Sequence, residues 1–238
     1  MIAAPWALHV QGEAAEARKL DRLETMPDNV PTEAARIFRQ LNLELTPRTA
    51  ADNVALARAG SLISRIPDLW NVVAMRVNRV AILHCADQCY DVSHSDPAWP
   101  GLICVSMPPS TPVGDLRLAE GIIHEAMHHH LSAVEATTSL VASNRAAYSP
   151  WKMSERPASG VLHGTYVFGC IAHALGRLIN EGLLDASQSL HAKNRISEIG
   201  KELEFIDHEI LLAALTEKGR HVHALAIGAV RSVRFESK

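Results

Sequence analysis

One long helical pattern constrains this chain more than any other part of the sequence. The segment DLRLAEGIIHEAMHHHLSAVEATTSLVAS spans residues 115–143, and Asp115 can cap a helix that continues through it. Ile122, Ile123, Ala126 and Met127 place apolar side chains at helical spacing, which indicates a buried helix. We therefore predict one long helix here, and its histidines and acids call for a chemical explanation.

Four histidines lie in this segment, and helical geometry divides them into two groups. His124, Glu125 and His128 form an H-E-x-x-H motif. Residues four apart on a helix share a face and lie about 6 Å apart along its axis, so His124 and His128 can reach one metal ion. His129 and His130 point away from that face, and we predict that they form a solvated or hydrogen-bonded flank.

A metal site needs at least a third protein ligand. Glu135 lies on the stripe of His124 but about 10 Å beyond His128 on an unbroken helix, and Glu120 is likewise too far from His128. Metzincins carry a further histidine after the motif, where this chain has Val134. The third ligand must come from another element, and the sequence offers these candidates: His163, His173, Glu181, His94 and His84.

The rest of the chain predicts more helices and a small sheet. We expect helices at residues 13–25, 32–42, about 46–65 (stopped by Pro67), 161–184 and 187–219, with a short tail after the last. Residues 72–85 and 102–107 are rich in β-branched side chains and predict strands, although the first run also has Ala and Met at helical spacing. Residues 144–160 predict a loop from their Pro, Ser and Gly content.

These elements predict an α+β fold: a mainly helical single domain with a small antiparallel sheet and a zincin-like HExxH helix. The domain would cover residues 1–238. Within it we expect a helical N-terminal part at about 1–70, a metal-binding part at about 71–185 and a C-terminal helix at about 186–238.

Composition and charge narrow the classes of function. The 238 residues have a formal net charge of -3, with basic residues scattered among acids, which disfavours nucleic-acid binding. The N-terminus does not have the pattern of a secretory signal, and no run reaches the roughly 18 apolar residues of a membrane helix. We therefore expect a soluble, cytoplasmic protein. Cys85, Cys89, Cys104 and Cys170 are expected to be reduced and buried.

Three segments together resemble the bacterial HExxH-motif peptide-modification proteins of gene clusters for ribosomally made, post-translationally modified peptides. They are SHSDPAWPGLICVS (93–106), AEGIIHEAMHHHL (119–131) and YSPWKMSERPASGVLHGTYVF (148–168). The pairing of the SPW, RP and LHG elements with the HExxH helix is more specific than HExxH alone. The resemblance implies an iron(II)- and 2-oxoglutarate-dependent oxygenase that hydroxylates a side-chain β-carbon in a precursor peptide.

The resemblance also implies roles for individual residues. The metal ligands would be His124, His128 and His163 of VLHG, an all-histidine set that departs from the commoner triad of two histidines and one carboxylate. Arg156 is the first choice for the distal carboxylate of 2-oxoglutarate, because a guanidinium can donate two parallel hydrogen bonds. Lys152 stands where the family has arginine, which keeps the charge but weakens a bidentate role.

Tyr148, Ser149 and Glu125 complete the candidate site. The hydroxyls of Tyr148 and Ser149 could bond to the cosubstrate. In an oxygenase, Glu125 would orient another group or contact substrate. The alternative function is a zincin-type zinc metallopeptidase, in which Glu125 is the general base and Tyr148 or a histidine stabilises the oxyanion. A third possibility is a peptide-binding protein without catalysis.

The segment before the HExxH helix suggests where a peptide would bind. Zincin-like folds place there the edge strand that borders the cleft. An exposed edge can bind an extended peptide by strand addition. His94 and Asp96 could contact that peptide, although loop residues of this kind more often cap turns.

Overall fold

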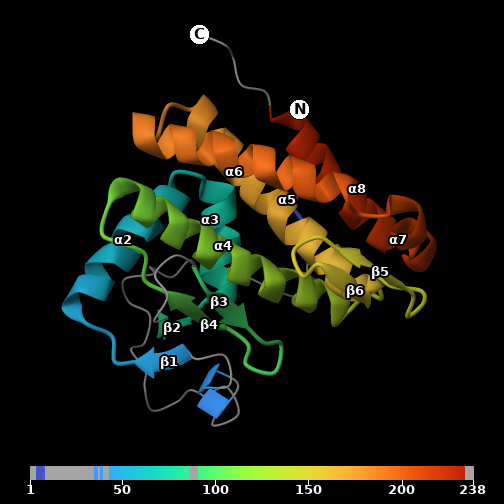
Figure 1. Cartoon of the computed structure of the whole chain (residues 1–238), viewed down its shortest axis with the longest axis horizontal. Helices are drawn as coiled ribbons and strands as arrows, with labels where there is room; N and C mark the ends of the chain where they lie inside the picture. Colours follow the sequence, from blue (N-terminus) through green and yellow to red (C-terminus); the bar gives the residue numbers. More distant parts are fainter. Residues whose placement is uncertain (1–3, 9–34, 37, 40–42, 86–90, 234–238) are drawn as a thin grey trace. The chain divides into compact units, whose positions relative to one another are not determined.

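The computed structural model describes residues 4–8, 35–36, 38–39, 43–85 and 91–233 (Figure 1). The chain divides into two compact units. We call Ala14–His130 the sheet unit, and Met1–Glu13 together with Leu131–Lys238 the helical unit. The boundary between them falls within helix α4 (Pro112–Glu135), which carries the HExxH motif.

The sheet unit contains a four-stranded mixed sheet. Its strands are β1 (Leu43–Thr46), β2 (Arg79–Cys85), β3 (Ser93–Ser95) and β4 (Leu102–Ser106), in the order β1-β2-β4-β3. The strands β2 and β4 run parallel, whereas β1 and β3 pair antiparallel with their neighbours. The predicted strands 72–85 and 102–107 are therefore not an antiparallel pair. The chain leaves β2, forms the edge strand β3 and only then returns as β4.

Strand β4 is the buried centre of this sheet, and all five of its residues are buried. Leu102 and Cys104 join an apolar cluster on one face, formed with Phe38, Leu43, Ala81 and Leu83. Because side chains alternate along a strand, Ile103 and Val105 point to the opposite face. Helix α4 comes close on that face: a Cβ on Gly121 would lie 4.0 Å from both Val105 Cγ1 and Ser93 Cβ.

Two helices precede the central strands. Helix α2 (Ala50–Ser64) begins at a capping box in which Thr49 and Asp52 bond each other's backbone amides. Helix α2 ends at Ser64, before Pro67, which confirms the helix predicted for about 46–65. Pro67 also starts a new helix, α3 (Pro67–Arg76), where its missing N–H costs nothing. Residues 72–76 are thus helical, and β2 starts only at Arg79. The alternative of helical structure is confirmed for the first part of the 72–85 run.

Helix α4 starts earlier and ends earlier than predicted. The Thr111 hydroxyl accepts a hydrogen bond from Gly114 N (3.0 Å), so Thr111 rather than Asp115 caps the first turn. Asp115 instead forms an ion pair with Arg58 (2.7 Å). The helix ends at Glu135, because the chain beyond it turns toward α7, where Ala142 N donates to Ala214 O (2.8 Å).

The helical unit opens with a hairpin where a loop was predicted. Strands β5 (Ala146–Ser149) and β6 (Ser154–Pro157) pair antiparallel. Helix α5 (Ala158–Asn180) follows and confirms the predicted helix; its C-terminal turn closes at Gly182, which has φ +68°. Figure 1 shows α5, α6 and α8 side by side, and α5 packs against both other helices.

The C-terminal region forms three helices instead of the single helix predicted for 187–219. They are α6 (Ala186–Glu204), α7 (His208–Ala214) and α8 (Glu217–Ser232). Asp207 caps α7 and Thr216 caps α8, each accepting a hydrogen bond from a backbone amide of the new first turn. The expected short tail is therefore mostly helix.

Other predictions have mixed outcomes. The mainly helical α+β fold is confirmed. Cys104 and Cys170 are buried and free, as predicted. Cys89, the side chain of Cys85 and the predicted helix 13–25 lie outside the described residues; of 32–42, the described positions 35, 36, 38 and 39 are helical. Within the described part of the chain, no helix is long and apolar enough to cross a membrane.

Candidate metal centre

His124 and His128 meet on one face of α4. Their Nε2 atoms lie 3.2 Å apart, and their ring planes are inclined at 64°. Both residues are half-buried, with 25% of the His124 side chain exposed. The helix thus directs two imidazole nitrogens to one point that solvent can reach.

This separation fits a shared metal ion. Two imidazole nitrogens bound at about 2.0–2.1 Å to one ion lie roughly 2.8–3.4 Å apart at coordination angles of about 90–110°. The observed 3.2 Å lies within that range. It also suits a hydrogen bond between two neutral rings, so the geometry permits metal binding without requiring it.

Glu125 of the motif is directed at the sheet. Its Oε1 accepts a hydrogen bond from the Ser93 hydroxyl (2.5 Å), and its Oε2 accepts one from the Ser95 hydroxyl (2.5 Å). Only 3% of Glu125 is exposed, and Oε1 lies 3.9 Å from His124 Nε2. Both oxygens of the motif carboxylate are therefore engaged by the edge strand β3.

The charge of Glu125 also reaches β4. Burial raises the pKa of the Cys104 thiol to about 12, and the negative charge of Glu125 adds to this effect. At neutral pH the thiol therefore stays protonated, and only a thiolate is a good metal ligand or nucleophile. Cys104 is a core side chain of the apolar cluster on the sheet face opposite α4.

His129 and His130 face away from the metal-binding side, as predicted. His129 Nε2 lies 2.9 Å from Leu102 O, and Arg76 Nε donates to His130 Nδ1 (3.2 Å). Both histidines are buried. The hydrogen-bonded form of the predicted flank is thus observed, and the solvated form is wrong.

His163 lies on α5 in the helical unit. Its Nε2 is 2.8 Å from Oε2 of Glu135, the last residue of α4. Across the described residues, no group of three or more His, Cys, Asp or Glu side chains is placed to hold a metal ion. The structure brings His124 to His128 and His163 to Glu135; the complete ligand set stays a prediction.

The other candidate third ligands have varied surroundings. His173 of α5 packs edge-on against Trp6, with ring centroids 5.1 Å apart. Glu181 follows α5 and pairs with Arg177 (3.4 Å). His84 is exposed on β2 opposite Glu44 of β1.

The candidate cosubstrate residues gather on the β5–β6 hairpin. Tyr148 pairs in register with Glu155, and Arg156 pairs with Ala147. Lys152 lies in the connecting turn, and its amide donates to Ser149 O (3.2 Å). Tyr148, Lys152 and Arg156 are all exposed, so a ligand can reach them from solvent, whereas Ser149 is buried.

Trp151 explains why the SPW and LHG elements go together. Its ring stacks on Phe168 of α5 (centroids 4.7 Å apart), and its Nε1 donates to Glu202 Oε2 (2.8 Å). A Cβ on Gly164 would lie 2.5 Å from the Trp151 ring. The glycine after His163 therefore leaves room for the indole that fixes the hairpin to α5.

His94 lies between the two serines that bind Glu125, and Asp96 follows them. His94 packs edge-on against Phe38, with centroids 5.4 Å apart, and lies near Trp99. Asp96 Oδ1 accepts a hydrogen bond from Ala98 N (2.8 Å), and Asp96 thus has the turn-capping role given above as the alternative. Their predicted contact with substrate stays a prediction.

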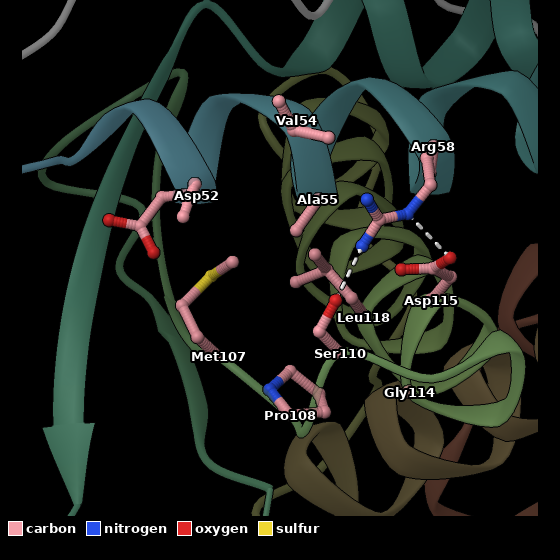
Figure 2. Close-up of a pocket in the computed structure, with 11 residues that line it drawn as sticks. Asp52, Val54, Ala55, Arg58, Met107, Pro108, Ser110, Gly114, Asp115 and Leu118 are labelled. Carbon is pink, nitrogen blue, oxygen red and sulfur yellow. Dashed lines mark hydrogen bonds and ion pairs between the residues drawn. The ribbon is translucent and has the colours of Figure 1, made fainter.

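A separate cavity lies beside the N-terminal end of α4 (Figure 2). It measures about 290 Å³ and lies between α2, the segment before α4 and the first turns of α4. Arg58 donates to Asp115 (2.7 Å) and to Ser110 (3.1 Å). The principal polar groups that line the cavity therefore bond to one another. None of the predicted site residues lines this cavity, so we do not assign the metal centre to it.

Compared with protein-family models and with curated proteins, the chain matches no family and no relative. The three segments named above and the geometry of α4 and β3 are therefore the observations from which a function can be proposed.

Ser93 and Ser95 are the site residues that sequence reasoning missed. Both lie in the SHS run of residues 93–95, where His94 is the residue predicted to contact substrate. Their spacing of two residues indicates that they share one face of the strand, because residues i and i+2 of a strand point to the same face. What could not be read from the sequence is that this face meets Glu125.

Proposed function

We propose that this protein is an iron(II)- and 2-oxoglutarate-dependent oxygenase that hydroxylates a side-chain β-carbon in a ribosomally made precursor peptide. The observation that carries the proposal is the convergence of the half-buried His124 and His128 at 3.2 Å on one helix face. The three segments that resemble the HExxH-motif peptide-modification proteins support peptide hydroxylation as the class of reaction.

The donor set suits iron(II). Imidazole nitrogen is a ligand that iron, zinc and copper all accept, and a site with few protein ligands leaves coordination positions for a cosubstrate. In the proposal His163 completes the set. Iron(II) with 2-oxoglutarate would supply the oxidation: one atom of O2 enters the C–H bond of the peptide, and the other converts 2-oxoglutarate to succinate and CO2.

The remaining residues bind and orient. Arg156 binds the distal carboxylate of 2-oxoglutarate through its planar guanidinium, with Lys152 and Tyr148 as further contacts on the same hairpin. His94 and Asp96 of the β3 region contact the precursor peptide. The chain contributes positioning and charge, while the oxidising power comes from the metal and cosubstrate.

The contacts of Glu125 favour an oxygenase over a zinc peptidase. A peptidase needs the motif glutamate within hydrogen-bond reach of the attacking water. Here each carboxylate oxygen accepts a serine hydroxyl at 2.5 Å, and the side chain is 3% exposed. This arrangement suits a glutamate that fixes structure beside the metal.

The decisive experiment measures turnover. Protein purified without oxygen and loaded with iron(II) should consume 2-oxoglutarate, release succinate and make the co-encoded peptide heavier by one oxygen atom. His124→Ala, His128→Ala and His163→Ala should abolish this, whereas His221→Ala, an exposed histidine of α8, should not. Succinate coupled to peptide turnover that survives loss of His124, His128 or His163 would refute the ligand assignment.

Glu125→Gln separates the two mechanisms. In the oxygenase, glutamine keeps an oxygen acceptor and a similar shape, so hydroxylation should be reduced without being lost. In a zinc peptidase the same change removes the general base and abolishes cleavage. Zinc in the purified protein, with peptide cleavage that needs no 2-oxoglutarate and is lost in Glu125→Gln, would establish the peptidase instead.

Arg156→Gln tests the cosubstrate site. Loss of a charged hydrogen-bond partner should raise the Kd of 2-oxoglutarate about 10- to 100-fold. Arg145→Gln is the matched control, because Arg145 is an exposed arginine just before the same hairpin. An unchanged Kd in Arg156→Gln would remove Arg156 from the site.

A further inference from the structure

Two serine hydroxyls hold the motif carboxylate from the same side. Ser93 Oγ donates to Glu125 Oε1 and Ser95 Oγ donates to Oε2, each at 2.5 Å. Both serines are half-buried, and Glu125 is buried. A hydroxyl has one hydrogen to donate, so both donors are committed to one acceptor group.

The strand itself is arranged for this contact. In β3 the alternation of side chains sends Ser93 and Ser95 to the α4 face and His94 to the opposite face, where it meets Phe38. The strand is only three residues long and pairs with β4 at one edge of the sheet. Two bonds to a carboxylate are therefore a large part of what fastens this short strand to the helix.

We propose that Ser93 and Ser95 are positioning residues of the metal centre, which hold the Glu125 carboxylate on β3 and withhold it from reaction as a base. The inference rests on the proposed function, because it explains how an HExxH helix can keep its glutamate beside a metal without hydrolytic chemistry. The inference gives the two serines of the SHS run a role of their own, distinct from the substrate contacts proposed for His94 and Asp96.

The physical reason is the competition for the carboxylate. Hydrogen bonds to an ionised acceptor are shorter and stronger than neutral ones. For Glu125 to accept a proton from water, an oxygen would have to leave its serine, and the hydroxyl left behind would be half-buried without an acceptor. Removing both hydroxyls takes away that cost and frees the carboxylate.

The first test uses metal-free protein and a water-soluble carbodiimide with glycinamide, which converts a reachable carboxyl group to an amide while the carbodiimide becomes a urea. Mass spectrometry follows the labelling rate of Glu125, with exposed Glu155 as internal reference. We expect Glu125 of Ser93→Ala/Ser95→Ala to react at least about 10-fold faster than in the wild type, given the loss of two charged hydrogen bonds. Ser93→Thr/Ser95→Thr keeps both hydroxyls and should restore slow labelling. Equal Glu125 rates in all three folded proteins, or failure of the threonine variant to restore protection, would overturn the proposal.

The second test asks what the released carboxylate does. In zinc-loaded Ser93→Ala/Ser95→Ala, water should hydrolyse p-nitrophenyl acetate. The water oxygen bonds to the acetyl carbon, Glu125 takes the water proton, and the ester C–O bond breaks to release p-nitrophenolate and leave acetic acid. We expect about 10-fold more turnover than in the wild type, lost again when Glu125→Gln is added. A rate that does not depend on Glu125, or no gain over a wild type that binds zinc equally well, would overturn the withholding role.

The two tests separate this proposal from the proposed function. If no metal binds at all, the oxygenase proposal fails, while the labelling of metal-free protein still decides whether the serines hold Glu125. If iron and 2-oxoglutarate turnover is established but Glu125 is labelled equally fast in the wild type and the alanine variant, the oxygenase proposal stands and the role of the serines fails.

Discussion

Two pairs of histidines in this protein have nearly the same separation but different surroundings. His124 and His128 on α4 bring two Nε2 atoms to 3.2 Å, and His208 Nδ1 lies 3.0 Å from His223 Nε2 between α7 and α8. The first pair is half-buried, whereas His223 is 6% exposed. The distance between two imidazoles therefore says little by itself.

The direction of the hydrogen bonds separates the pairs. His208 Nε2 lies 3.0 Å from Leu203 O, which can only accept, so this nitrogen must donate. In the neutral ring His208 Nδ1 then accepts, and His223 Nε2 donates to it. The second pair is a directed chain that ends on the backbone. In the first pair the two facing atoms are both Nε2 and both side chains are half-buried, which is an arrangement that a metal can use.

The largest expected difference between the pairs is in metal affinity. His124→Ala or His128→Ala should weaken zinc or iron(II) binding about 100- to 1,000-fold, because binding free energies of about 10–16 kcal/mol are shared among a few ligands. His208→Ala should leave the affinity unchanged. Competition with a chromogenic chelator measures all three, and an equal loss in His208→Ala would break the distinction.

The next effect concerns pH and His223, the buried member of the second pair. Burial, then the neighbouring His208 and Arg231, lowers the pKa of His223 from 6.5 to about 4. The unfolded chain therefore binds a proton below about pH 6.5, whereas the folded chain binds it only below about pH 4. Stability from this group is complete above pH 6.5 and is lost as the pH falls from 6.5 to 4, by about 3 kcal/mol at most.

Urea unfolding at several pH values tests this sign. Other titrating groups are shared by wild type and His223→Leu, so the difference between their free energies of unfolding isolates His223. That difference should favour the wild type most above pH 6.5 and shrink toward pH 4. A difference that stays constant with pH would show that His223 is not held neutral.

The sequence predicted those parts of the fold that are set by local periodicity. Helices α4 and α5 follow from apolar spacing, and the convergence of His124 and His128 follows from their separation by four. The division of the C-terminal region into three helices could not be predicted in this way, because the caps Asp207 and Thr216 lie inside a continuous amphipathic pattern. The composition of the β5–β6 hairpin is rich in turn-forming residues, and it therefore predicted a loop instead of two strands.

Non-local pairing limited the prediction of the site. The parallel register of β2 and β4 joins segments about twenty residues apart. Neither segment has a sequence pattern that specifies the strand it pairs with. The role of Ser93 and Ser95 depends on that register and on the packing of α4 over the sheet. The contact between His163 and Glu135 is of the same non-local kind, because it joins residues 28 positions apart on different helices.

Stability in metal-free protein should distinguish the pairs by a smaller amount. His208→Ala leaves the buried Nε2–H of His223 without its acceptor, which should cost about 1–3 kcal/mol in the free energy of unfolding. His124→Ala changes a half-exposed side chain and should stay within about 0.5 kcal/mol. Urea unfolding at pH 7.5 compares them, and a larger cost for His124→Ala would reverse their roles.

The smallest effect is expected where a histidine has a partner near solvent. His163 and Glu135 lie 2.8 Å apart, with 16% and 28% of their side chains exposed. A partly solvated pair of this kind contributes about 0–1 kcal/mol, because water and salt screen it. Glu135→Gln keeps an acceptor for His163, so the free energy of unfolding should change by less than about 1 kcal/mol, and less still in high salt. A loss above about 2 kcal/mol would make this contact as strong as the His208–His223 hydrogen bond. It would then show that partner geometry outweighs exposure in deciding what a histidine contributes to this fold.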